Sequence, residues 1–226
     1  MKRIAAVIVL SLMAASLGGC EYLFGRSWVI REKLTVTVET PAGERIGSSV
    51  TEWHIRNSPG YAYSLGGIGK RQKGEAVVIE VSTGKYLFAL LGKPHPLLGL
   101  IQPKEIGWSA EDELDRFSAE TGFSGPVREE EYPLLVTFDN LAWPGSVTEV
   151  KPYDLATAFG PGVKLKSLTL ETTDEPVTKG QIEKLLPWLP DFYDRQLDGQ
   201  RYETVKSSNR FANSLTSGFF KTERKR

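Results

Sequence analysis

The sequence predicts an α+β fold, in which a single domain is built mostly of antiparallel β-strands with a few short helices. Strand patterns dominate the first two thirds of the chain, and helix signals appear late instead of alternating with strands as βαβ units require. The composition, 40% hydrophobic and 25% charged, is ordinary for a globular protein. A length of 226 residues corresponds to one domain or at most two small ones.

The clearest strand pattern lies near the start of the expected domain. Polar and apolar side chains alternate here, which places Leu34, Val36 and Val38 on one face of a strand. A segment of turn composition follows, and beyond it the chain is rich in β-branched and aromatic residues. We therefore expect a β-hairpin over Lys33–Ile55 that turns near Gly43.

Further strands are expected along the middle of the chain. Residues 75–82 and 85–91 should form a second hairpin, and their nearly continuous apolar runs suit strands that are covered on both faces. Three later segments also have strand composition, namely 134–138, 146–150 and 163–171. The alternation breaks once in the last of these, which indicates a β-bulge.

Helix signals are fewer than strand signals. Ser109 is expected to cap a helix that runs through Glu120, with acidic residues near its start. Residues 154–159 form a short helical candidate that a Gly-Pro-Gly sequence ends. Thr178 has capping-box spacing and should open a helix through Leu186.

The N-terminus predicts a secretory signal peptide, because a basic start, a short apolar run and small residues follow one another. The run is too short to cross a bilayer, which needs about 20 apolar residues. Its exit, Leu17-Gly18-Gly19-Cys20, resembles the lipobox of bacterial lipoproteins. The resemblance implies a diacylglycerol on the Cys20 sulfur, cleavage before Cys20 and acylation of the new amine. The alternative is an ordinary signal peptide with a chance cysteine.

Cysteine content agrees with the lipoprotein interpretation. Cys20 is the only cysteine of the chain, so it cannot form an internal disulfide, and lipidation accounts for the leftover thiol. The expected organisation is a signal peptide over 1–19, a lipid-anchored tether over 20–31, a globular β-rich domain over 32–220 and a basic tail over 221–226. Glu21 follows the cysteine where inner-membrane lipoproteins tend to carry Asp. We therefore expect the outer membrane, facing the periplasm, with the inner membrane as the alternative.

Charge argues against nucleic acid as a partner. The chain carries 28 basic and 28 acidic residues, and loss of the leader with its two basic residues leaves a slight acidic excess. The glycine-rich run 66–71 is not a phosphate loop. Ser64 stands where a glycine is required, and Arg71 stands where Ser or Thr would bind magnesium. A plain turn is expected there.

The chain offers little for catalysis or metal binding. His54 belongs to an expected strand, where its ring should lie at the sheet margin with a backbone or water partner, and His95 lies between two prolines. With the cysteine committed to lipid, no Cys/His cluster remains for zinc. The acidic runs 111–113 and 129–131 lack the spacing of a calcium loop and should be solvated. We expect no metal, no cofactor and no catalytic residue.

One stretch resembles a known family as a whole. It contains the segments Phe138-Asp139-Asn140, Ser146-Val147, Pro152-Tyr153-Asp154-Leu155, Phe159-Gly160-Pro161-Gly162-Val163 and Glu175-Pro176-Val177-Thr178. Together they resemble a family of uncharacterised proteobacterial lipoproteins, which implies a stable β-rich domain and no assigned activity. We expect a non-catalytic envelope binding or accessory module, held to the membrane by lipid on Cys20. The alternative is a hydrolase of cell-envelope material, which would need convergent titratable groups in a pocket.

Overall fold

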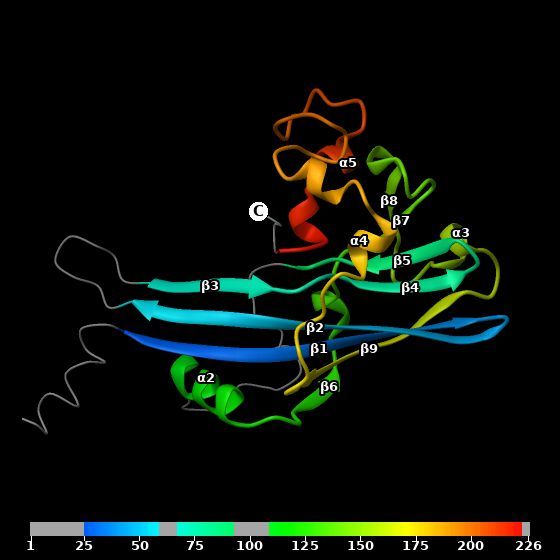
Figure 1. The fold of residues 1–226 in the computed structure, drawn as a ribbon. Coiled ribbons are helices and arrows are strands. Elements are labelled where there is room, and N and C mark those ends of the chain that lie inside the picture. Colours follow the sequence, from blue (N-terminus) through cyan, green and yellow to red (C-terminus); the bar gives the residue numbers. More distant parts are fainter. Residues whose placement is uncertain (1–24, 59–66, 93–108, 223–226) are drawn as a thin grey trace, which may run out of the picture.

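The computed structural model describes residues 25–58, 67–92 and 109–222, and their strands form two antiparallel sheets (Figure 1). The larger sheet has the order β3-β2-β1-β9-β6, with β1 (Arg26–Thr40), β2 (Gly43–Ser58), β3 (Gly67–Lys73), β6 (Ser124–Pro126) and β9 (Lys164–Thr172). The smaller has the order β4-β5-β7-β8, with β4 (Val77–Ser82), β5 (Lys85–Ala89), β7 (Leu135–Phe138) and β8 (Val147–Glu149).

The helices are short and lie between or after the strands. They are α2 (Ala110–Ala119), α3 (Ala156–Phe159), α4 (Ile182–Leu185), α5 (Arg210–Asn213) and the 3-10 turns η2 (Glu129–Glu131), η3 (Pro144–Ser146), η4 (Leu189–Phe192) and η5 (Ser217–Phe219). The prediction of mostly antiparallel strands with a few short helices is confirmed. Within the described residues the fold is better classed as mainly β than as α+β, because α2 is the sole helix longer than four residues.

The predicted first hairpin is present and is longer than expected. Leu34, Val36 and Val38 are buried on one face of β1, as the alternation predicts, and Thr40 pairs with Gly43 across the turn. The same face continues through Trp28 and Ile30 toward the N-terminus. Residues 26–31, expected to be tether, are therefore the first part of a strand, because they pair with β2 and bury these two side chains.

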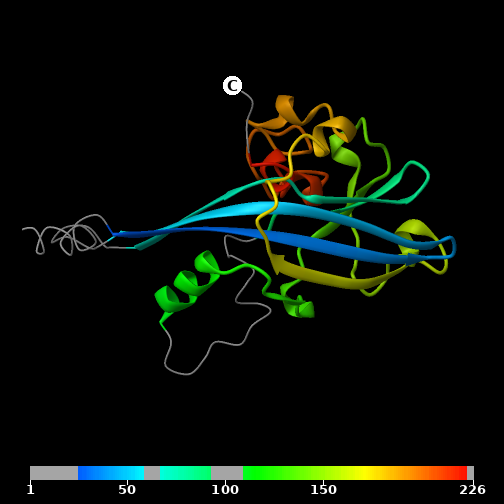
Figure 2. The same cartoon turned by 60° about the horizontal axis from the view of Figure 1, so that its bottom comes forward.

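Helix α2 lies beside the N-terminal part of the hairpin, away from the C-terminal segment (Figure 2). It begins with the predicted cap: the Ser109 hydroxyl accepts from the Asp112 backbone N–H at 3.1 Å, and the Asp112 carboxylate accepts from the Ser109 N–H at 2.8 Å. Asp115 then accepts from the Trp28 indole N–H at 2.7 Å and from Arg26 at 2.6 Å. These bonds fix α2 on the core face of β1.

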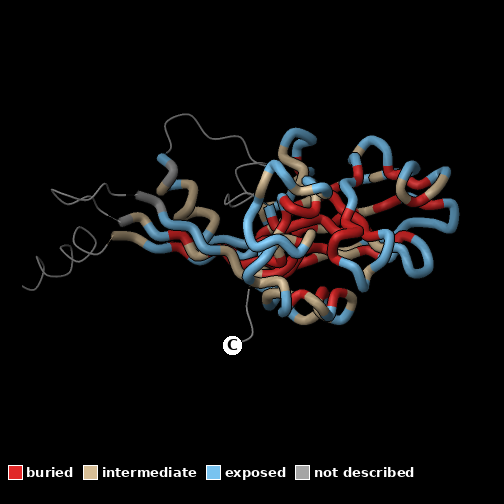
Figure 3. The backbone as a smooth tube through the Cα atoms, turned by 90° about the horizontal axis from the view of Figure 1, so that it is seen from above, coloured by how far each residue is buried: buried red, intermediate tan, exposed pale blue. Residues whose placement is uncertain are grey.

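The two sheets pack face to face, and buried residues gather where they overlap (Figure 3). Gly47 on β2 marks a close contact. A Cβ added at this glycine would lie 2.4 Å from the Ile79 Cγ1 and 2.5 Å from the Val78 carbonyl oxygen, so β2 and β4 approach backbone to side chain here. The sheets therefore meet tightly near the hairpin turn.

A second core lies on the other face of the smaller sheet, as the apolar runs of the second hairpin predict. There the C-terminal segment covers β5 and β7. Phe88 meets Phe138 edge to face at 5.5 Å and Phe220 at 5.9 Å, and Trp188 meets Phe138 at 5.9 Å between ring centroids. The smaller sheet is thus covered on both faces, and the larger sheet contributes only to the first core.

The prediction of a plain turn over 66–71 is wrong. Most of this segment is edge strand β3, which pairs with β2 from Gly67 onward. Glycine is tolerated there because an edge strand pairs on one side only, and a Cβ added at Gly69 would make just an ordinary contact, 3.8 Å from the Arg56 carbonyl oxygen. The predicted β-bulge in β9 is present, opposite Thr37 and Val38 of β1.

The helix expected after Thr178 begins later, at Ile182. The Thr178 hydroxyl instead accepts from the Val50 backbone N–H at 2.8 Å, which ties the segment to β2. The capping role belongs to a residue distant in sequence. The Glu75 carboxylate accepts the N–H groups of Gly180, Gln181 and Ile182, at 2.6, 2.9 and 3.3 Å. Capping is therefore supplied by tertiary structure.

Candidate functional site

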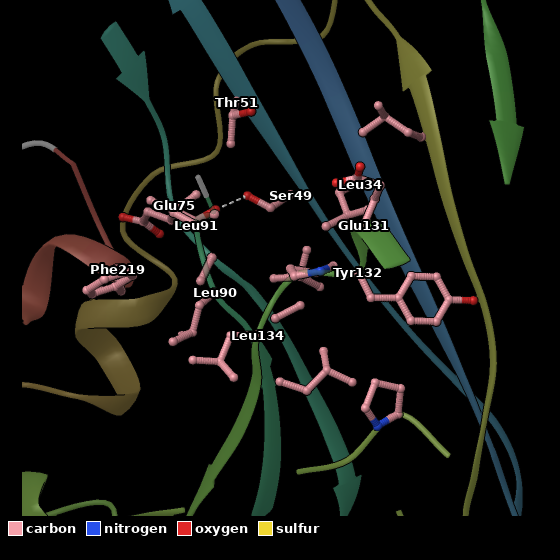
Figure 4. Close-up of a pocket in the computed structure, with 18 of the residues that line it drawn as sticks. Leu34, Ser49, Thr51, Glu75, Leu90, Leu91, Glu131, Tyr132, Leu134 and Phe219 are labelled. Atoms are coloured by element: carbon pink, nitrogen blue, oxygen red, sulfur yellow. Dashed lines mark hydrogen bonds between the residues drawn. The ribbon is translucent and has the colours of Figure 1, made fainter. Parts of the chain in front are cut away.

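A cavity of about 450 Å³ lies between the two sheets, next to the ends of β5 and β7 (Figure 4). Its lining is mainly apolar and comes from both sheets and from the C-terminal segment, and it includes Leu34, Trp53, Leu90, Leu91, Leu134 and Phe219. A volume of this size falls within the usual range for small-molecule sites, roughly 300–1,000 Å³. The cavity is therefore large enough for part of a small ligand.

Backbone hydrogen bonds between neighbouring segments close the wall of this cavity. The Leu90 N–H donates to the Leu134 carbonyl at 2.9 Å, and the Leu91 N–H donates to the Phe219 carbonyl at 2.8 Å. The Ser49 hydroxyl donates to the Glu75 carbonyl at 2.6 Å. These backbone groups are satisfied inside the wall, so the surface turned to the cavity is largely hydrocarbon.

One side of the cavity is acidic. Glu129, Glu130 and Glu131 of η2 lie along it together with Glu149. Two cations outside the lining partly neutralise these four acids: Arg128 lies 3.6 Å from Glu130 and 3.8 Å from Glu131, and Lys151 lies 2.6 Å from Glu149. Burial and the Glu129 charge both raise the pKa of the Tyr132 phenol, so this tyrosine stays protonated at neutral pH. The cavity thus offers an apolar interior and an anionic border.

Glu75 is the buried carboxylate of the lining, and it already has hydrogen-bond and ion-pair partners within the protein. Besides the three N–H groups at the start of α4, it faces the Lys221 ammonium at 3.5 Å, and Lys221 lies 3.0 Å from Glu183. Backbone N–H groups and Lys221 thus occupy both oxygens of this carboxylate, which joins the start of α4 to the end of the chain's C-terminal segment.

The residues singled out in the sequence lie elsewhere. Cys20 and His95 fall outside the described residues. His54 lies on the opposite face of β2 from the cavity, and its Nε2 is 2.7 Å from the Glu52 carboxylate, so its partner is an acid and not the expected backbone or water. The acidic run 111–113 is less solvated than expected, because Glu111 bonds Asn57 and Arg26.

The cavity was not predicted from the sequence. The acidic run 129–131 of η2 stands out in the sequence, but its neighbouring residues do not indicate that it borders an apolar space. The described residues hold no group of three or more His, Cys, Asp or Glu side chains placed to bind a metal ion, and none of their helices is long and apolar enough to span a membrane. Comparison with known protein families, curated proteins and solved structures finds no match for the chain.

Proposed function

We propose that this chain is a lipoprotein of the bacterial outer membrane, anchored by lipid on Cys20 and facing the periplasm, whose domain is a non-catalytic binding module. The observation that carries the binding role is the apolar cavity between the sheets, with its volume of about 450 Å³. Its ligand is a small envelope molecule that buries an apolar group there. The hydrolase alternative lacks comparable support, because the buried carboxylate of the lining, Glu75, is held by backbone donors and Lys221.

The proposed lipid anchor on Cys20 can be tested directly by mass analysis. Intact-mass analysis of protein extracted from membranes should find a chain that begins at Cys20 and carries a diacylglyceryl group. The matched control is Cys20→Ser, which should remain unprocessed and unmodified because the acceptor sulfur is gone. A mature chain that begins at any earlier residue would exclude the anchor. In the same strains, Glu21→Asp should move protein from the outer to the inner membrane fraction.

The proposed ligand site in the cavity can be tested by probe binding. An uncharged fluorescent apolar probe, N-phenyl-1-naphthylamine, should bind the wild type with a blue-shifted, saturable signal. Leu134→Trp adds bulk to the cavity wall and should weaken binding at least tenfold, whereas Ile46→Trp adds the same side chain at a position that is 65% exposed and should not. Thermal melts should show that both variants remain folded.

Two results would reject the proposed ligand site. One is equal probe affinity in the wild type and in Leu134→Trp. The other involves residues 93–108, which connect two lining regions along the chain. If the wild type binds no probe and a variant with a Gly/Ser linker in place of 93–108 does, the cavity holds the chain's own residues and not a ligand.

A further inference from the structure

The outward face of the hairpin carries a cluster of basic side chains. Trp28, Ile30, Trp53 and Ile55 face the core, so the residues between them face outward. Register places β1, β2 and β3 residues side by side in rows across this face. We call these residues the basic face; they are Val29, Arg31, Glu52, His54, Arg56, Arg71 and Lys73.

Positive charge dominates the basic face. Its four Arg and Lys residues stand against one carboxylate, Glu52. That carboxylate is shared, because it accepts from Arg31 at 2.8 Å and from His54 at 2.7 Å, with Lys73 at 3.4 Å. Burial alone raises the pKa of Glu52, but these hydrogen bonds lower it to about 2. Glu52 therefore stays ionised and holds its basic neighbours in place, while Arg56 and Arg71 are exposed.

Among the described residues, the segment that covers this side of the larger sheet ends beside the basic face. Residues 173–178 cross the sheet as a strap: the Thr173 N–H donates to the Arg31 carbonyl at 3.1 Å, and the Thr178 N–H donates to the Val50 carbonyl at 3.0 Å. Under the strap, Lys33 is neutralised by Glu175 at 2.5 Å. Beyond it, among the described residues, Val29 is 48% exposed on the β1 side of the basic face, opposite His54 of β2.

The basic face lies at the end of the hairpin where the chain enters the domain (Figure 1). Gly25 is five residues after Cys20, and an extended chain spans at most about 3.5 Å per residue. A lipid on Cys20 therefore keeps the start of β1 within about 18 Å of the anchor. Basic residues held this close to an anionic membrane surface are attracted to it electrostatically.

We propose that the basic face docks on the anionic phospholipid headgroups of the membrane to which the chain is anchored, so that β1, β2 and β3 lie along the bilayer. The position of the face rests on the proposed anchor, whereas its charge and exposure do not. Arg56 and Arg71 contact headgroup phosphates, and Val29 contacts the border between the headgroups and the acyl chains. The cavity, on the core side of the same strands, then opens away from the membrane surface contacted by the hairpin.

Vesicle co-sedimentation tests this docking without the anchor. The protein is the mature chain, residues 20–226 with Cys20→Ser, which keeps every described residue. It should bind phosphatidylcholine vesicles containing 30% phosphatidylglycerol and not pure phosphatidylcholine, and 0.5 M salt should release it. Arg56→Glu with Arg71→Glu should weaken binding at least tenfold. The milder Arg56→Gln with Arg71→Gln keeps the test open if the reversal unfolds the domain.

The matched control reverses two charges at the far end of the molecule. Arg45→Glu with Lys85→Glu changes exposed residues near the two hairpin turns and should bind within twofold of the wild type. Equal loss in this control, or equal binding to both kinds of vesicle, would overturn the proposal. Displacement by millimolar inorganic phosphate would also overturn it, since it would indicate a small-anion site. The mass test of Cys20 is separate, so failure of the anchor and failure of the docking are distinguishable.

Discussion

Val36→Asp should destabilise the domain by more than about 4 kcal/mol, enough to unfold much of it at 37 °C. Val36 is fully buried in the middle of β1, opposite Gly47 on β2 and Leu168 on β9. A carboxylate at this position would face the packed interior between the sheets without a partner. A domain of this size is stable by only about 5–15 kcal/mol, so one such charge removes a large share of its stability.

The matched control lies one residue further along the same strand. Thr37 points to the opposite face of β1 and is only half-buried, so Thr37→Asp should cost less than about 1 kcal/mol. Urea titration followed by far-UV circular dichroism measures both free energies of unfolding. A stable Val36→Asp protein together with a strongly destabilised Thr37→Asp protein would show that the two faces of β1 are assigned in reverse.

The hairpin shows how far the sequence alone could predict this fold. Alternation identified the buried face from Leu34 to Val38, because a strand with one core face must repeat every two residues. The prediction stopped too early because Glu32 interrupts the apolar series. Glu32 is 1% exposed, and it is accommodated by the Trp53 indole, whose N–H donates to its carboxylate at 3.1 Å across the strand pair. A cross-strand partner of this kind is invisible in a local pattern.

The candidate site was less accessible to sequence reasoning than the fold. Its wall joins Leu34 of β1 to Phe219 of η5, which are close only after both sheets and the C-terminal segment have packed. The edge strand β3 was hidden for another reason. Its glycines suggest a turn, and only the pairing of Arg71 with His54 and of Lys73 with Glu52 reveals a strand. Register, set by the neighbouring strand, created the basic face from residues that are unremarkable individually.

The two proposals assign different roles to the two faces of one hairpin. The core face of β1 and β2 contributes Leu34, Ser49 and Trp53 to the cavity, and the outward face carries the basic side chains. Because side chains alternate strictly along a strand, a single-residue slip in register would exchange these faces. The tight approach at Gly47, where no Cβ fits beside Val78 and Ile79, opposes such a slip. One packing contact therefore protects both proposed surfaces.

Glu75→Gln should destabilise the domain by about 3–5 kcal/mol, although it exchanges a single heavy atom. Glu75 is 1% exposed, and its carboxylate joins the start of α4 to Lys221. An amide has one acceptor oxygen and cannot satisfy all of these donors. The Lys221 ammonium is 7% exposed and would retain Glu183 alone. Burial lowers the pKa of Lys221, but Glu183 and Glu75 raise it overall, so it remains charged in the folded protein.

A double-mutant cycle distinguishes the contribution of this buried ion pair from nonspecific destabilisation of the domain. Glu75→Gln with Lys221→Met should recover part of the loss, because the second change removes the cation that the first leaves poorly paired. Glu80→Gln, at an exposed position of β4, is the control and should change the unfolding free energy by less than about 0.5 kcal/mol. Probe binding should fall with stability in Glu75→Gln, since the bonds from Ala76 and Leu91 to the C-terminal segment form one side of the cavity. A Glu75→Gln protein as stable as the wild type would show that the carboxylate does not hold the C-terminal segment in place.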